Sequence, residues 1–195
     1  MAVSVTPAVR TRRFTRVEYE RLTELGFFQP AERLELIDGL LILREPQAAP
    51  HATAIRLVGV ALRAVFGEGW VVDIQLPVAL DDDSEPEPDA SVIPGGPRDY
   101  RQAHPSRPVL IVEVADSGLA FDRGDKASLY ARAGVADYWI VNLVDHVLEV
   151  RRQPEVSDDA PYGFRYRSVE RLAPAAIVSP LAAPDARILV ADLLP

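Results

Sequence analysis

Apolar residues recur along the chain with two different periods, and these separate the expected helices from the expected strands. Within residues 51–66, Ile55, Val58 and Leu62 recur at helical spacing, and a glycine follows. Shorter apolar runs bounded by Gly, Pro, Asn or Asp are typical of strands. We therefore predict helices over 17–25, 51–66 and 122–133, and strands over 70–76, 89–94, 109–114, 136–143, 146–152 and 163–172.

Two local motifs define the chain near its start. Thr15 and Glu18 are spaced as a capping box, in which the threonine hydroxyl accepts from the amide of the third helical residue and Glu18 bonds back to the cap. Asp38-Gly39 stands between two short apolar runs, LELI and LLIL. This dipeptide favours a type I′ turn, because both central residues need positive φ. We predict a helix that stops at Gly26 and is followed by a β-hairpin.

The order of these elements predicts the fold class. Helix, hairpin and helix come first, and strands then surround one further helix, which is typical of an α/β or α+β domain with a mixed central sheet flanked by helices. The run 109–114 is apolar apart from Glu113, so we expect a central strand buried on both faces. No repeat or linker divides the chain. We expect a flexible arm over 1–13 and one domain over 14–195, with the apolar tail 187–194 packed on the core.

Composition and charge narrow the possible chemistry. The chain has 195 residues, a formal net charge of −8 and no cysteine, which excludes disulfides, thiolate nucleophiles and cysteine-ligated zinc. Its three histidines, His51, His104 and His146, are far apart in sequence, so a histidine-built zinc site is not expected. Net acidity disfavours broad nucleic-acid binding, although a bound metal reverses the sign locally. Without an apolar signal sequence or an uncharged run of about 20 residues, we expect a cytoplasmic protein without membrane contact.

Two carboxylates stand at conspicuous positions in the expected sheet. Glu113 lies in an otherwise apolar strand, where burial is costly unless a cation or hydrogen-bond donors satisfy it. Asp89 opens a short strand after the acidic segment 81–88. If the two strands are neighbours, both carboxylates lie at one end of the sheet, and such oxygen ligands suit Mg²⁺ or Mn²⁺. The alternatives are a structural salt bridge for Glu113 and a turn position for Asp89.

The chain contains one lysine among 21 basic residues, Lys126. Asp122, Lys126 and Tyr130 recur every four residues and form one polar stripe on the expected helix. A helix that crosses back over the end of strand 109–114 would bring the ammonium group to the carboxylates. The alternative is a charged face in contact with solvent.

Several motifs occur in an order that resembles a known family. They are ELIDG (35–39), His51, PD (88–89), LIVEV (110–114), the series Asp122, Lys126 and Tyr130, and GVADYWIV (134–141). Over residues 14–152 this order resembles the Uma-type restriction endonuclease family of the PD-(D/E)XK phosphodiesterase superfamily. The resemblance implies a restriction-endonuclease-like fold and divalent-metal-dependent cleavage of DNA.

The resemblance also implies roles for individual residues. Asp89 and Glu113 would hold Mg²⁺ or Mn²⁺ together with the backbone carbonyl of Val114. The superfamily lysine usually stands two residues after the second carboxylate, where this chain has Ala115. The family pattern places the lysine in the following helix instead. Lys126 is therefore expected to position water or to stabilise the transition state.

Four more residues match the family pattern or the polar stripe. Glu35 matches the early acidic position and is expected to act as a third ligand or to orient a metal-bound water. His51 matches without an assigned role, and capping, substrate contact and catalysis all stay open. Tyr130 is expected to hold Lys126 or to contact phosphate, and Asp122 is expected to orient the helix.

Other interpretations of the sequence stay open. Arg98, Arg101 and Arg107 are expected to grip the DNA backbone, but arginine-rich loops are mostly solvated. The fold could instead serve as a catalytically silent module for binding or assembly, which predicts carboxylates tied up by arginine side chains. The acidic segment 81–89 could be a calcium loop, although it lacks the central glycine and the spaced glutamate of an EF-hand.

Self-association is a further expectation. Residues 139–141 and 147–150 have the apolar character of exposed edge strands, which would suit pairing in a homodimer. The alternative is that both are ordinary core strands. The sequence does not separate the two.

Overall fold

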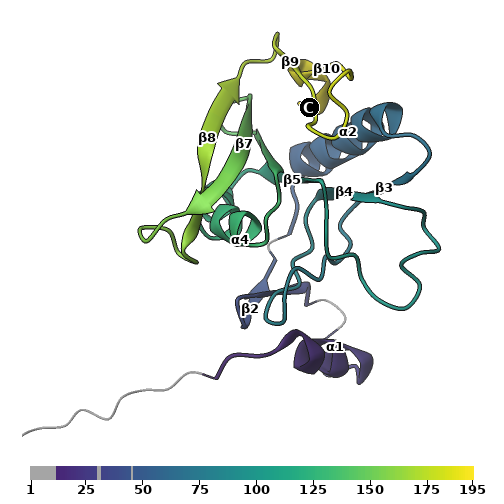
Figure 1. Ribbon diagram of the computed structural model, residues 1–195, viewed down its shortest axis with the longest axis vertical. Helices are drawn as coiled ribbons and strands as arrows, with labels where there is room; N and C mark the ends of the chain where they lie inside the picture. Colours follow the sequence, from purple (N-terminus) through teal and green to yellow (C-terminus); the bar gives the residue numbers. More distant parts are fainter. Residues whose placement is uncertain (1–11, 30–31, 45) are drawn as a thin grey trace, which may run out of the picture.

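A six-stranded sheet forms the centre of the molecule in the computed structural model, which describes residues 12–29, 32–44 and 46–195 (Figure 1). In spatial order its strands are β3 (Trp70–Asp73), β4 (Ala90–Pro94), β5 (Leu110–Ala115), β6 (Asp137–Asn142), β7 (Val147–Val156) and β8 (Phe164–Leu172). Only β5 and β6 are parallel, and every other neighbouring pair in this sheet is antiparallel. Helices cover both faces (Figure 1). The predicted mixed central sheet flanked by helices is confirmed.

The central strand β5 is buried along its whole length, as its apolar run predicts. Successive side chains of a strand point to opposite faces of the sheet. Val112 accordingly packs in the same cluster as α2 (Ala49–Val65), whereas Ile111 packs with α4 (Ala127–Arg132) on the other face. Glu113 therefore faces the side of α4.

The C-terminal tail and α2 cover one face of the sheet together (Figure 1). The tail contains β9 (Ile177–Val178), β10 (Ile188–Leu189) and the 3-10 helix η2 (Val190–Leu193). Val190 and Leu193 are buried in the same cluster as Leu62 of α2. The predicted packing of the apolar tail on the core is confirmed.

The helical segment on the other face is irregular. It consists of α3 (Leu119–Phe121), a π-helical turn η1 (Asp122–Lys126) and then α4. In the π-helical turn the amide of Ala127 bonds to the carbonyl of Asp122, five residues earlier. The prediction of one regular helix over 122–133 is therefore wrong in its start and in its regularity. Asp122, Lys126 and Tyr130 are all buried, so the alternative of a charged face in solvent is also wrong.

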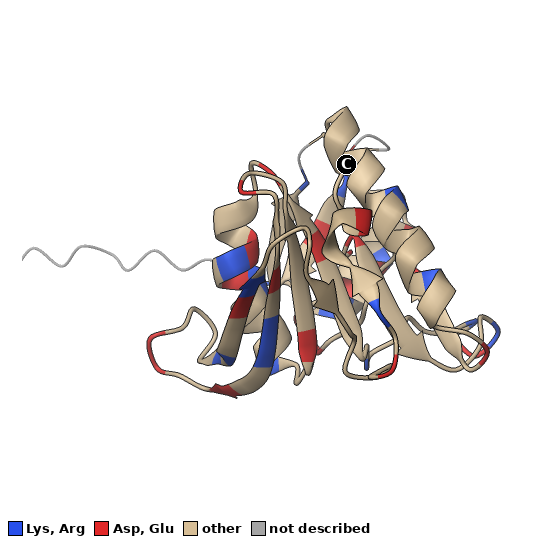
Figure 2. Ribbon diagram, turned by 90° about the horizontal axis from the view of Figure 1, so that it is seen from above, with Lys and Arg blue, Asp and Glu red and all other residues tan. Residues whose placement is uncertain are grey.

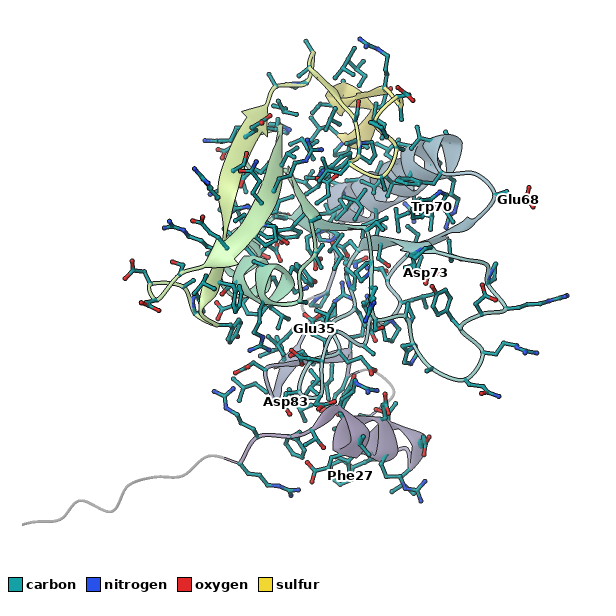
Figure 3. All side chains as sticks on the ribbon, viewed as in Figure 1. Phe27, Glu35, Glu68, Trp70, Asp73 and Asp83 are labelled. Carbon is teal, nitrogen blue, oxygen red and sulfur yellow. The ribbon has the colours of Figure 1, made fainter. Side chains whose placement is uncertain are left out.

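The N-terminal elements form as their local motifs predict. They are α1 (Arg16–Glu24) and the antiparallel strands β1 (Leu34–Ile37) and β2 (Leu40–Leu43). Thr15 makes both bonds of the capping box. Asp38 and Gly39 have φ angles of 47° and 77°, as a type I′ turn requires. The hairpin places Glu35 in the interior of the molecule, whereas Phe27 lies at the periphery (Figure 3).

The outer parts of the molecule carry charges of both signs, interspersed along strands and loops (Figure 2). Of the predicted arm over residues 1–13, only Arg12 and Arg13 lie within the described residues, and they pair with Glu18 and Asp38. None of the helices in the described ranges has the length and apolarity needed to cross a bilayer.

The proposed edge strands lie inside the sheet. Residues 139–141 belong to β6, which lies between β5 and β7, and residues 147–150 belong to β7, which lies between β6 and β8. Their apolar character serves the two faces of a central sheet, so the prediction of exposed edges is wrong and the core-strand alternative is confirmed. The strands at the edges are β3 and β8. A homodimer stays a prediction.

The packing of α2 on the sheet predicts a difference between two positions of that helix. Leu62 is fully buried, whereas Val60 is 67% exposed. Leu62→Ala is expected to lower the free energy of unfolding by about 2–5 kcal/mol, because it leaves a cavity, while Val60→Ala should change it by about 0.5 kcal/mol at most. Urea denaturation measures both. Equal effects would contradict the packing described here.

Candidate active site

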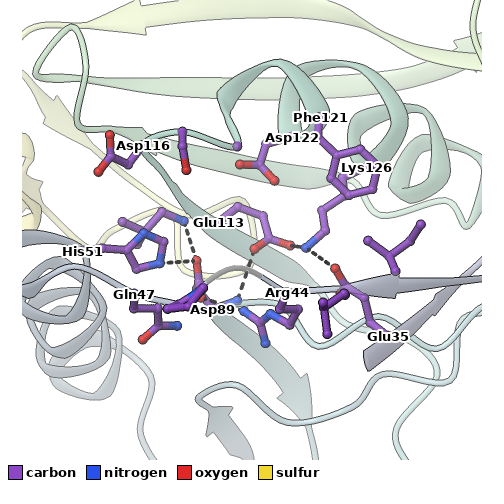
Figure 4. Close-up of a pocket in the computed structure, with 16 residues that line it drawn as sticks. Glu35, Arg44, Gln47, His51, Asp89, Glu113, Asp116, Phe121, Asp122 and Lys126 are labelled. Carbon is purple, nitrogen blue, oxygen red and sulfur yellow. Dashed lines mark hydrogen bonds and ion pairs between the residues drawn. The ribbon is translucent and has the colours of Figure 1, made fainter. Parts of the chain in front are cut away.

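An open pocket of about 300 Å³ lies where the start of β4, the end of β5, the hairpin and the first turns of α2 meet (Figure 4). Its lining includes most of the side chains that the sequence singled out, namely Glu35, His51, Asp89, Glu113, Asp122 and Lys126. The pocket is also lined by Arg44, so four of these side chains carry carboxyl groups and two, Arg44 and Lys126, are basic. The pocket is therefore richer in acid than in base.

Asp89 and Glu113 come together because their strands are neighbours. Ala90, the first residue of β4, pairs with Val112 of β5. Because the strands are antiparallel, Asp89, directly before β4, lies opposite Glu113. The Asp89 amide donates to Glu113 Oε2 at 3.3 Å, and the Val114 amide donates to Asp89 Oδ2 at 2.8 Å. Both side chains are almost fully buried. The backbone of the sheet thus fixes the two carboxylates at the same end.

Lys126 reaches these carboxylates from the π-helical turn. Its Nζ donates to Glu113 Oε1 at 3.0 Å and lies 3.2 Å from Glu35 Oε1 (Figure 4). Glu35 is held in turn by the amide of Glu87, which donates to Glu35 Oε2 at 3.1 Å. The ammonium group therefore joins three separate elements, η1, β5 and β1.

Tyr130 lies one turn further along and also contacts Glu113. Its hydroxyl donates to Glu113 Oε1 at 2.6 Å. The predicted contact with Lys126 is replaced by a shared acceptor, since both donors bond to the same oxygen. The carbonyl of Asp122 accepts from the Tyr138 hydroxyl at 3.0 Å, which fastens the π-helical turn to β6.

Two residues of the site had no signal in the sequence. Arg44 follows β2 directly, and its guanidinium lies 3.1 Å from Asp89 Oδ1. Gln75 follows β3 and donates its side-chain amide to the same oxygen at 3.1 Å. Gln75 has a φ of 53°, a conformation that non-glycine residues seldom adopt and that tends to occur at functional sites. This bend also explains why β3 ends at Asp73, short of the predicted strand over 70–76.

His51 stands in the first turns of α2 and faces Asp89. Its Nε2 lies 3.5 Å from Asp89 Oδ2, yet it has no hydrogen-bond partner although the atom is buried. The helix has no side-chain cap, so His51 does not act as one. Of the three roles left open, capping is not found, and substrate contact and catalysis stay predictions.

The three arginines expected to grip DNA lie elsewhere. Arg98, Arg101 and Arg107 are exposed, and none of them lines this pocket. Arg101 borders a separate hollow beside α1. The positive groups at the pocket are Arg44 and Lys126 instead.

Burial and charge shift the acidities within the site. Burial raises the pKa of Glu113, and Lys126 opposes that rise. Burial would also raise the pKa of Asp89, but His51, the Val114 amide and Arg44 hold it below its usual value. Burial would lower the pKa of Lys126, but Glu113 and Glu35 raise it, so the lysine keeps its proton.

The carboxylate oxygens of this pocket are suitable ligands for a divalent cation such as Mg²⁺. Among the described residues, no three acidic or histidine side chains already surround one point. Mg²⁺ usually needs only one or two protein carboxylates, with water and substrate phosphate completing its shell. Asp89 and Glu113 supply two, and beside them lies the buried His51 Nε2, which makes no hydrogen bond and is 3.5 Å from Asp89 Oδ2.

Comparison with models of protein families shows which family the chain belongs to. A model of the Uma2 family, described as putative restriction endonucleases, matches residues 16–191. The chain belongs to the Uma2 family. The resemblance drawn from the sequence motifs is thereby confirmed, and the match extends over the whole sheet of this Uma2 chain, from α1 into η2.

Among solved structures, the Uma2 chain is similar to a putative nuclease of the DUF820 group from Anabaena variabilis ATCC 29413. The TM-score is 0.69 at 17% sequence identity, and the likeness covers 92% of this chain and 97% of the other. At this identity the comparison establishes the fold. No curated protein matches the chain.

The buried Asp122 predicts a dependence of stability on pH. Burial, with Glu113 next, raises the pKa of Asp122 from 3.8 to about 8 in the folded chain. Between these values the folded state holds a proton that the unfolded chain releases, so stability falls as pH rises, by up to about 1.4 kcal/mol per pH unit. Asp122→Asn stays neutral and should flatten this slope.

Urea denaturation of the wild type and of Asp122→Asn between about pH 5 and pH 8 measures the two slopes. Asp99→Asn, in an exposed loop, is the matched control and should keep the wild-type slope. Identical slopes in wild type and Asp122→Asn would contradict a protonated Asp122.

Proposed function

We propose that this chain is a divalent-metal-dependent nuclease that hydrolyses phosphodiester bonds in DNA. The observation that supports this most is the meeting of Asp89 and Glu113, from neighbouring strands, with the buried ammonium group of Lys126 in an open pocket. Paired hard oxygen ligands beside a fixed positive charge are suited to phosphoryl chemistry.

The proposed ion is Mg²⁺ or Mn²⁺. Asp89 and Glu113 would hold it, with the Val114 carbonyl as a backbone ligand and Glu35 as a third ligand or as a group that orients water. When bound, the ion would supply Lewis acidity at the phosphate. It would also reverse the negative sign of the pocket, which a chain of net charge −8 needs in order to receive a polyanion.

Lys126 is the proposed positive group of the reaction. Its position in the π-helical turn, and not two residues after Glu113, still brings Nζ to 3.0 Å from the Glu113 carboxylate. A protonated amine there can position water or stabilise the charge that develops on phosphate oxygens. Tyr130, which bonds to Glu113 from the core, is a positioning residue.

A second candidate function is a nuclease fold without catalysis, retained for binding or assembly. One observation favours it: Asp89 Oδ1 already accepts from both Arg44 and Gln75. A carboxylate tied up by arginine is what a silent module predicts. The two candidates differ in whether a divalent cation enters this site.

Cleavage of DNA with Mg²⁺ or Mn²⁺ tests the proposal. Asp89→Asn and Lys126→Met are each expected to lower the rate by about 10²–10³-fold or more. The first removes a charged ligand of the proposed metal ion, and the second removes the positive charge beside the reacting phosphate. Asp145→Asn lies outside the pocket and should cleave like the wild type. Gel electrophoresis of supercoiled and linear DNA measures the rates.

Circular dichroism checks that each variant is folded. A wild type that cleaves no DNA with either ion, or cleavage that Asp89→Asn and Lys126→Met leave unchanged, would refute the nuclease and favour the silent module.

A further inference from the structure

Arg44 is a cation enclosed in the acidic pocket. Its side chain is 11% exposed, and it lies 3.1 Å from Asp89 Oδ1 and 3.4 Å from Glu87 Oε2. A buried guanidinium needs such carboxylates, because an unpaired charge away from water is strongly unfavourable. Arg44 therefore bridges one carboxylate inside the pocket and one outside its lining.

Asp89 has enough hydrogen bonds without this arginine. Its Oδ2 accepts from the Val114 amide at 2.8 Å, and its Oδ1 accepts from Gln75 at 3.1 Å. The main contribution of Arg44 is therefore its positive charge, which lies beside the carboxylate of Asp89. Positive charge is also what a divalent cation would bring to the same oxygens.

Resting on the function proposed above, we propose that Arg44 is a built-in counter-ion of Asp89 that competes with the divalent cation. When the site is empty, Arg44 compensates the charge of Asp89. When the cation binds, Arg44 leaves Asp89 and keeps its contact with Glu87. The chain thereby lowers its own affinity for metal.

Of the two cations in the pocket, Arg44 and Lys126, the one proposed to change partner is Arg44. Lys126 is 4% exposed and lies between Glu113 and Glu35, which are both buried. Arg44 has a second partner, Glu87, whose side chain is 24% exposed. A guanidinium that moves toward Glu87 keeps an ion pair beside solvent. An ammonium that leaves Glu113 keeps only Glu35, which is itself buried, so it gains no contact with water.

Binding of Mn²⁺, measured by isothermal titration calorimetry, tests the competition. Arg44→Gln keeps an amide donor for Asp89 but removes the charge, so it should bind Mn²⁺ about tenfold more tightly than the wild type. Arg132→Met is the matched control, since Arg132 pairs with Asp38 and Asp81, away from the pocket. Its affinity should equal that of the wild type.

Each outcome is informative. Equal or weaker binding by Arg44→Gln overturns the competition but leaves a metal-dependent nuclease standing. Absence of Mn²⁺ binding in the wild type and in both variants overturns the competition and the metal-dependent function together. Tighter binding by Arg44→Gln alone supports the competition.

A measurement on the wild-type chain tests the same proposal even if Arg44→Gln does not fold. With ¹⁵N-labelled arginine, the Nε–H signal of Arg44 should shift when Mg²⁺ is added, whereas that of Arg132 should not, because only Arg44 changes partner. An Arg44 signal that stays in place while Mg²⁺ binds would overturn the competition.

Discussion

The ammonium group of Lys126 is shut away from water and lies between two buried carboxylates, Glu113 of β5 and Glu35 of β1. A buried charge of this kind is tolerated only with partners at close distance, and removal of one partner from such a set typically costs about 3–5 kcal/mol. The sheet, the hairpin and the π-helical turn must therefore meet at this point. The irregular turn between α3 and α4 delivers the lysine there, and the Tyr138 hydroxyl fastens it to β6.

Strand pairing supplies the other half of the site. The antiparallel register of β4 and β5 fixes Asp89 beside Glu113 by backbone geometry, without any flexible loop between them. A carboxylate on a strand, such as Glu113, and one directly before a strand, such as Asp89, keep their separation when a ligand arrives, which is what a metal and a phosphate require. The cost is mutual repulsion inside the core, and the chain offsets it with Lys126 on one side and Arg44 on the other.

The sequence predicted the elements whose causes are local. Asp38-Gly39 determines its own turn, the capping box at Thr15 forms within four residues, and the buried strand around Glu113 follows from an unbroken apolar run. The π-helical turn was missed, because its Lys126 contacts Glu113 and Glu35, and contacts between residues so far apart in the chain leave no pattern in the local spacing. Stretches of β6 and β7 were mistaken for edges, since an apolar run does not say how many neighbours a strand has.

Within the site, the acids and the lysine were predicted as candidates, while Arg44 and Gln75 were not. Each of these two stands just beyond a short strand and reaches Asp89 across the fold. Such contacts depend on where β2 and β3 end relative to β4, a property of packing and not of sequence period. Arg44 is also one of 20 arginines, so its residue type carries no signal of its own.

Diffraction from crystals soaked in MnCl₂, collected at the manganese absorption edge, tests the account most directly. A single anomalous peak is expected between the carboxylates of Asp89 and Glu113, with the ammonium of Lys126 still beside Glu113. A fully soaked crystal without a peak at these carboxylates, or with its peak at the acidic segment 81–88 instead, would contradict the account.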